Sequence, residues 1–107
     1  MLPTSKLINE IYEELQVDMI AYNVASEHLA IIKHKVNTAR YDAIHGYVLE
    51  GKNAEAREAD FRAKFPHLIQ ELHDIEMEHK QAKLQLDLGK LEVDRIKLLI
   101  RLQEIEK

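Results

Sequence analysis

The chain has 107 residues and a formal net charge of −4, and about half of it is Ala, Glu, Lys, Leu or Arg, a composition typical of long helices and coiled coils. Its 3 Gly and 2 Pro are too few for a sandwich or barrel of many short strands. The absence of Cys excludes disulfides, thiolate metal sites and thiol catalysis. We therefore expect an all-α fold in a single domain that covers residues 1–107.

A first long helix is predicted over residues 5–49, which contain one Gly and no Pro. Pro3 and Thr4 are start signals, and Gly51 is the expected stop. Apolar or small residues recur in this segment at spacings of three and four, which places them on one face of a helix. This inner stripe consists of Ile8, Ile11, Leu15, Tyr22, Ala25, Leu29, Ile32, Val36, Ala39, Ala43 and Gly46, with Asp18 as its one charged member.

A short helix is predicted over residues 54–64 and a second long helix over residues 67–106. Asn53 is a preferred N-cap for the short helix, and Pro66 pushes the residue before it out of helical geometry. Pro66 is also suited to open the following helix. The inner stripe here alternates steps of four and three, as in a heptad repeat. It consists of Phe61, Phe65, Leu68, Leu72, Ile75, His79, Ala82, Leu86, Gly89, Val93, Ile96, Ile100 and Gln103.

Helices of this length, roughly 60–67 Å at 1.5 Å per residue, are too long for a compact ball. The expected architecture is an elongated antiparallel helical hairpin with the short helix at the bend. If Leu49 lies near Pro66, residue 31 sits beside residue 84, and residue 10 beside residue 105.

Each long helix carries a second apolar stripe, displaced by two residues, or about 200°, from the first and hence on the opposite side. Water contact for so many large apolar side chains is costly, at ~25 cal/mol per Å², and patches of this size usually mark interfaces. The pattern predicts self-association, most simply as a dimeric four-helix bundle. The alternative is scattered apolar surface residues, which are normal. The predicted oligomer interface consists of Val17, Ile20, Val24, Ile31, Leu84, Leu88, Leu91, Leu98, Leu102 and Ile105.

The half of the hairpin near the bend is expected to project as a two-helix arm that residues 53–65 cap. Its tip is slightly basic, which suits an acidic protein partner or nucleic acid, while the alternative is ordinary solvated helix charge. The predicted partner-binding residues are Tyr47, Lys52, Arg57, Arg62 and Lys64.

No catalytic, cofactor-binding or metal-binding residues are predicted, and the chain is expected not to be an enzyme. Helical metal ligands need spacings of three or four, whereas His67, His73 and His79 are six apart. Glu76 and His79 match the Glu-x-x-His signature of di-iron bundles, but the facing part of the first helix offers no Glu. No phosphate-binding loop or dinucleotide motif is present.

The turn Gly51-Lys52-Asn53-Ala54-Glu55-Ala56-Arg57 lies between two long helices rich in Glu, Leu and Lys. On the basis of this turn, residues 35–105 resemble small bacteriophage-encoded helical-hairpin (coiled-coil) proteins. These proteins are largely uncharacterised and occur among phage replication and recombination genes. The resemblance implies a phage or prophage origin and an accessory role in DNA metabolism. It supplies no site residues.

The leading functional hypothesis is a non-enzymatic oligomeric adaptor or regulator that binds itself, as a homodimer or higher oligomer, and an unidentified protein partner. As a viral protein it would act in DNA recombination or replication, or on a host protein. The alternatives are a nucleic-acid-binding oligomer that presents several weakly basic tips and a ferritin-like metal enzyme. No secretion signal or membrane span is recognisable, so the expected location is the cytoplasm, that of the host if the chain is phage-encoded.

Overall fold

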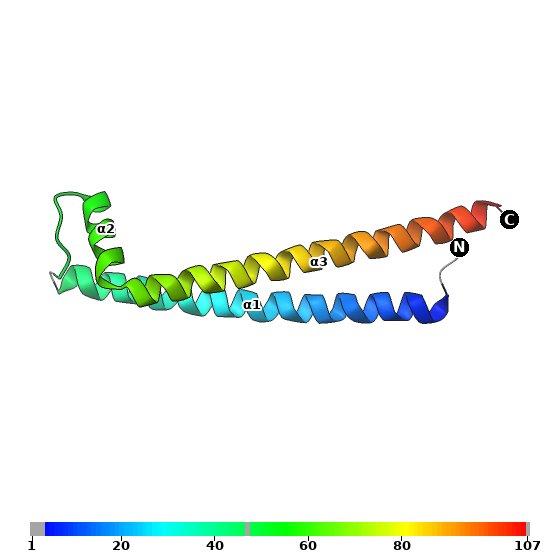
Figure 1. The fold of residues 1–107 in the computed structure, drawn as a ribbon, viewed down its shortest axis with the longest axis horizontal. Helices are drawn as coiled ribbons and strands as arrows, with labels where there is room; N and C mark the ends of the chain where they lie inside the picture. Colours follow the sequence, from blue (N-terminus) through cyan, green and yellow to red (C-terminus); the bar gives the residue numbers. More distant parts are fainter. Residues whose placement is uncertain (1–3, 47, 107) are drawn as a thin grey trace. The chain divides into compact units, whose positions relative to one another are not determined.

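The computed structural model describes residues 4–46 and 48–106 and contains three helices in this part of the chain (Figure 1). The long helices are α1 (Ser5–His45) and α3 (Pro66–Glu106), and the short helix α2 (Ala54–Lys64) lies between them in sequence. The long helices pack antiparallel to each other. The prediction of an all-α fold with two long antiparallel helices and a short helix between them is therefore confirmed.

The described residues form two compact units. Unit 1 contains α1 up to Ala25 and α3 from His79 onward, so it is built from two helical segments. Unit 2 is Ser26–Glu78, which holds the second part of α1, all of α2 and the first part of α3. The two units therefore differ in how many helices enclose their core.

The helix starts follow the predicted capping residues. The Thr4 hydroxyl accepts a hydrogen bond from the Leu7 amide at 3.1 Å, and the Asn53 side chain accepts one from the Ala56 amide at 2.8 Å, which satisfies amides that have no partner inside the helix. Pro66 is the first residue of α3, as its fixed φ favours. Pro3 lies outside the described residues.

The predicted end of the first helix at residue 49 is wrong, because α1 ends at His45. The chain after it is bound to α2: the Lys64 ammonium donates to the Val48 carbonyl at 2.6 Å, and the Glu50 amide donates to Asp60 at 2.8 Å. These bonds replace helical ones. Gly51 is not the stop of α1 but has φ 142°, and a Cβ there would lie 2.7 Å from the Ala56 Cβ, so its role is the close approach to α2.

The predicted pairing register is also wrong. His28 contacts Glu78 at 3.2 Å and Lys35 contacts Glu71 at 3.3 Å, so residue 31 is level with about residue 75 rather than 84. The shift arises because α1 is shorter than expected and because α2 covers its last turns. Phe61 of α2 packs there in one buried cluster with Ala43.

The inner stripes form the cores of both units, as predicted. In unit 2, Phe61 is fully buried among residues of all three helices. In unit 1 the Tyr22 ring lies 5.1 Å from the His79 ring, and Gly89 faces Leu15, whose Cδ1 would be 3.2 Å from an added Cβ. The small residue at 89 therefore admits the bulky Leu15 side chain. Among the described stripe members, Gly46 is the exception, because it is exposed.

Candidate interaction surfaces

Unit 1 leaves the second apolar stripe of each helix uncovered. Buried and exposed residues alternate along α3 in the predicted way: Leu86 is 7% exposed, whereas Leu91, on the second stripe, is 63% exposed. We call these the α1 outer face (Val17, Ile20, Val24) and the α3 outer face (Leu84, Leu88, Leu91, Leu98, Leu102, Ile105), and every member is exposed. These many exposed apolar residues suggest self-association.

Ile31, the tenth predicted interface residue, is exposed but belongs to unit 2. The expectation that Ile31 sits beside Leu84, at the start of the second stripe of α3, is therefore wrong. In the observed register, residue 31 is level with the polar part of α3, about nine residues before Leu84. It lines a hollow of about 160 Å³ in unit 2 with Ile75.

One cation lies within the α3 outer face. Arg95 continues the steps of three and four that connect Leu91 and Leu98. Its guanidinium donates to Glu92 through Nε at 3.2 Å and Nη2 at 2.6 Å. Hydrogen bonds from Arg95, with its positive charge, lower the pKa of the Glu92 carboxyl, and the same pairing raises the pKa of Arg95.

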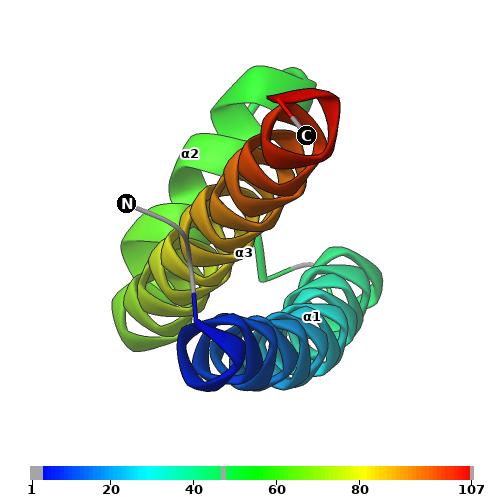
Figure 2. The same cartoon turned by 90° about the vertical axis from the view of Figure 1, so that its right-hand side faces the viewer.

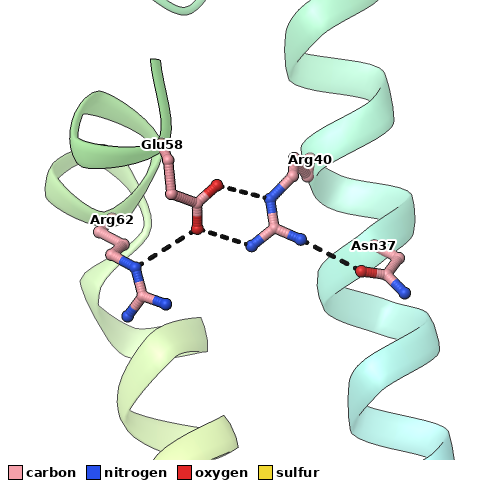
Figure 3. Close-up of polar contacts among 4 residues, drawn as sticks. All are labelled: Asn37, Arg40, Glu58 and Arg62. Atoms are coloured by element: carbon pink, nitrogen blue, oxygen red, sulfur yellow. Dashed lines mark hydrogen bonds and ion pairs between the residues drawn. The ribbon is translucent and has the colours of Figure 1, made fainter. Parts of the chain in front are cut away.

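Unit 2 is held at the α1–α2 contact by a charged network (Figure 3). Arg40 donates to both carboxylate oxygens of Glu58 at 2.8 Å and to the Asn37 side chain at 3.1 Å. Arg62 adds a second cation 3.3 Å from Glu58. The pKa of Glu58 is lowered, first by its hydrogen bond to Arg40 and, against the opposing effect of burial, by the charges of both arginines. The carboxylate thus joins α2 to α1 in the bidentate geometry that arginine favours.

Two of the predicted tip cations are bound within the chain. Arg62 pairs with Glu58, and Lys64 lies 2.9 Å from Asp60 while it also donates to a backbone carbonyl. Within the part of the chain that the structure describes, the side chains of Lys52 and Arg57 make no hydrogen bond or ion pair, although the Arg57 amide donates to the Asn53 carbonyl. Tyr47, the fifth predicted tip residue, lies outside the described residues. The tip therefore offers less available positive charge than its sequence suggests.

A hollow of about 210 Å³ opens beside Arg57. Ile44, at the end of α1, and Leu49, in the following segment, supply apolar lining, and Arg40 and Glu58 supply charged lining. Sequence reasoning did not identify Ile44, Leu49 or Arg40 as surface-forming residues. A pairing such as Arg40–Glu58 leaves no spacing signal within one helix, because it joins residues from separate helices.

The histidines do not assemble a metal centre in the part of the chain described. No group of three or more His, Asp or Glu side chains there is arranged to hold a metal ion. His79 instead lies on the inner stripe against the Tyr22 ring, and Glu78, its neighbour, contacts His28. Glu78 therefore makes a surface contact, and His79 packs against an aromatic ring.

Comparison with protein-family models, with curated proteins and with solved structures finds no match for this chain. The resemblance to phage helical-hairpin proteins thus has no support from these comparisons. No helix among the described residues has the length and apolar character needed to cross a membrane.

Proposed function

We propose that this chain is a non-enzymatic, self-associating adaptor, in which unit 1 joins copies of the chain and the tip of unit 2 binds another protein. One observation carries the proposal. The two helical segments of unit 1 pack their inner stripes against each other, and the nine large apolar side chains of the two outer faces remain exposed. An outer face of this kind is stabilised when a partner removes it from water.

The tip of unit 2 supports the second half of the proposal. Its hollow combines the apolar side chains of Ile44 and Leu49 with the guanidinium of Arg57. This combination fits an apolar side chain next to a carboxylate, as an acidic protein segment would offer. The charged network around Glu58 holds α2 in place, so the hollow is formed before a partner arrives.

The resemblance noted in the sequence supplies candidates for that partner. They are proteins of phage DNA recombination or replication, or a host protein that the phage regulates. The intracellular location proposed for the chain, the host cytoplasm, rests on the same resemblance.

Affinity capture with three baits tests the proposal. The wild type and an oligomer-interface variant, Leu88→Glu with Leu98→Glu, should retain the same protein in stoichiometric amount. A tip variant, Arg57→Glu with Ile44→Ser, should lose it while keeping the native mass of the wild type. Equal recovery by all three baits would contradict a tip-specific partner.

Treatment of the captured material with nuclease distinguishes the adaptor from the alternative function, a nucleic-acid-binding oligomer. A bound protein should survive the treatment and survive moderate salt. Binding that disappears with nuclease and falls steeply with salt would indicate phosphate contacts instead, and would replace the adaptor by a nucleic-acid-binding oligomer.

A further inference from the structure

The two outer faces of unit 1 point in nearly opposite directions. On each helix the outer stripe is displaced by two residues from the inner stripe, which is about 200° around the axis. The inner stripes of α1 and α3 face each other, as Leu15 and Gly89 show. The α1 outer face is therefore turned away from α3, and the α3 outer face away from α1. Figure 2 looks along the helices, with the α1 segment of unit 1 in blue and its α3 segment in orange to red.

This geometry decides against the dimeric four-helix bundle as the assembly. In a closed bundle each helix buries one continuous apolar side around a common core. A single partner placed against one outer face of unit 1 leaves the other outer face in water. Burial of both faces requires that every copy contact two neighbours.

The charges on the outer faces indicate which face meets which. The steps that connect Val24, Ile20 and Val17 continue toward the start of α1 to Glu13 and Glu10, so the α1 outer face ends in two carboxylates. The α3 outer face contains a single cation, Arg95. The two helices thus carry opposite charges within otherwise apolar stripes.

The observed register places these opposite charges at the same level. Gly89 faces Leu15, so six residues further along α3, Arg95 is level with about residue 9 of α1, beside Glu10. By the same count, Leu88 is level with about Val17, and Leu84 with about Ile20. A copy placed with its α1 outer face against the α3 outer face of another copy, in the same antiparallel register, brings Leu84 against Ile20, Leu88 against Val17 and Arg95 against Glu10.

Pairing of like faces places like charges together. An antiparallel pairing of two α3 outer faces that overlaps Leu84–Ile105 fully has its centre close to residue 95. It would bring the two Arg95 guanidinium groups together in the middle of an apolar seam, and like charges in such a position disfavour a partner by several kcal/mol in general. In the mixed pairing, Arg95 keeps its bonds to Glu92 and uses its remaining N–H donors for the second carboxylate.

We propose that copies of this chain associate head to tail, with the α3 outer face of one copy against the α1 outer face of the next. Such a heterologous contact is not self-complementary, so it continues from copy to copy until a ring closes or a filament grows. This inference rests on the proposed self-association of unit 1. It adds the identity of the two surfaces that meet and the consequence that the assembly exceeds a dimer.

Two variants with one disabled face each test the proposal. The first carries Leu88→Glu and Leu98→Glu on the α3 outer face. The second carries Val17→Glu and Ile20→Glu on the α1 outer face. Both replace exposed side chains, and a circular dichroism spectrum confirms that each remains helical. Their masses are measured by sedimentation, alone and mixed in equal amounts.

Head-to-tail pairing predicts that each variant alone has the monomer mass of 12.5 kDa. Mixed, they should form a heterodimer of twice that mass, because each supplies the face that the other lacks. A homodimer of either variant alone, or a mixture in which no heterodimer forms, would overturn the proposal. A wild type that is itself monomeric would instead remove the self-association on which the inference rests.

A charge exchange tests the register. Arg95→Glu and Glu10→Arg should each weaken association by about tenfold or more, and the double variant should recover most of the loss. Lys97→Glu is the matched control, because it makes the same charge change at an exposed position off the α3 outer face. Equal losses for Arg95→Glu and Lys97→Glu, without recovery in the double variant, would show that Arg95 does not face Glu10.

Discussion

Unit 2 and unit 1 are built on the same two long helices, yet they enclose their cores differently. In unit 2 the short helix α2 adds a third wall, and Phe61 is fully buried with its ring 4.8 Å from that of Phe65. The Lys35–Glu71 ion pair connects α1 to α3 around this core, and the Arg40–Glu58 ion pair connects α1 to α2. In unit 1 the described core residues come from two helical segments, and buried Val93 and Ile96 alternate with exposed leucines.

Two packed helices can bury only the sides that face each other, so helices that are apolar on two sides keep one apolar side exposed. Of the ten predicted interface residues, unit 2 holds only Ile31, and α2 helps to close its core. Unit 1 has two stripes per helix, and its own residues can cover only the inner pair. The sequence of unit 1 is therefore consistent with assembly, and that of unit 2 with a core that is complete within one chain.

The largest change in stability is expected from substitution of Phe61. Phe61→Ala removes a ring that is 0% exposed and that the Arg40 guanidinium covers at 4.9 Å, so we expect a loss of about 3–5 kcal/mol in the free energy of unfolding of unit 2. Denaturant unfolding, with amide exchange in α2 as the local readout, measures this loss.

The control for Phe61→Ala is Tyr41→Ala, which removes an exposed ring from the same unit and should change stability by only about 0.5 kcal/mol. Neither variant should alter the native mass. A change of mass in Phe61→Ala would show that unit 2 contributes to self-association.

A smaller change in stability is expected from substitution of Gly89, on the inner stripe of unit 1. Leucine there meets Leu15 and Asp18, which lie 3.2 and 3.1 Å from the position of an added Cβ, and overpacking of this kind costs about 1–3 kcal/mol. Alanine needs only small shifts of these two side-chain ends and gains up to about 1 kcal/mol of helix propensity. Thermal unfolding of both variants should give opposite shifts. If the leucine variant unfolded at the same temperature as the alanine variant, the inner stripes would not be tightly packed at Gly89.

The smallest effect is expected at the Arg40–Glu58 pair. Because both side chains are about one third exposed, Glu58→Gln should cost no more than about 1 kcal/mol. The lowered pKa of Glu58 means that its contribution is present above the ordinary value of 4.5 and is lost as the pH falls through the lowered pKa. Glu58→Gln should therefore lose less stability below pH 4.5 than the wild type. Denaturant unfolding of the wild type and of Glu58→Gln on either side of pH 4.5 measures this difference.

Much of this fold is predictable from periodicity and capping, because both act within one helix. The inner stripes, the N-cap at Asn53 and the exposure of the outer faces are all visible as local spacings. The end of α1 and the register are not, since they depend on bonds such as Lys64 to Val48 that join residues far apart in the sequence. The same limit applies to the tip, where Arg62 and Lys64 look available in the sequence but are paired in the structure.

The central claim, that unit 1 is the assembling unit, is tested most directly by the native mass of the wild type and of the variant with Leu88→Glu and Leu98→Glu. Light scattering over a range of concentrations should give a mass well above 12.5 kDa for the wild type and the monomer mass for the variant. Gln81→Glu with Gln85→Glu, which adds the same charge to exposed positions of α3, should keep the wild-type mass. A monomeric wild type, or a Leu88 and Leu98 variant that retains the full mass, would contradict the account.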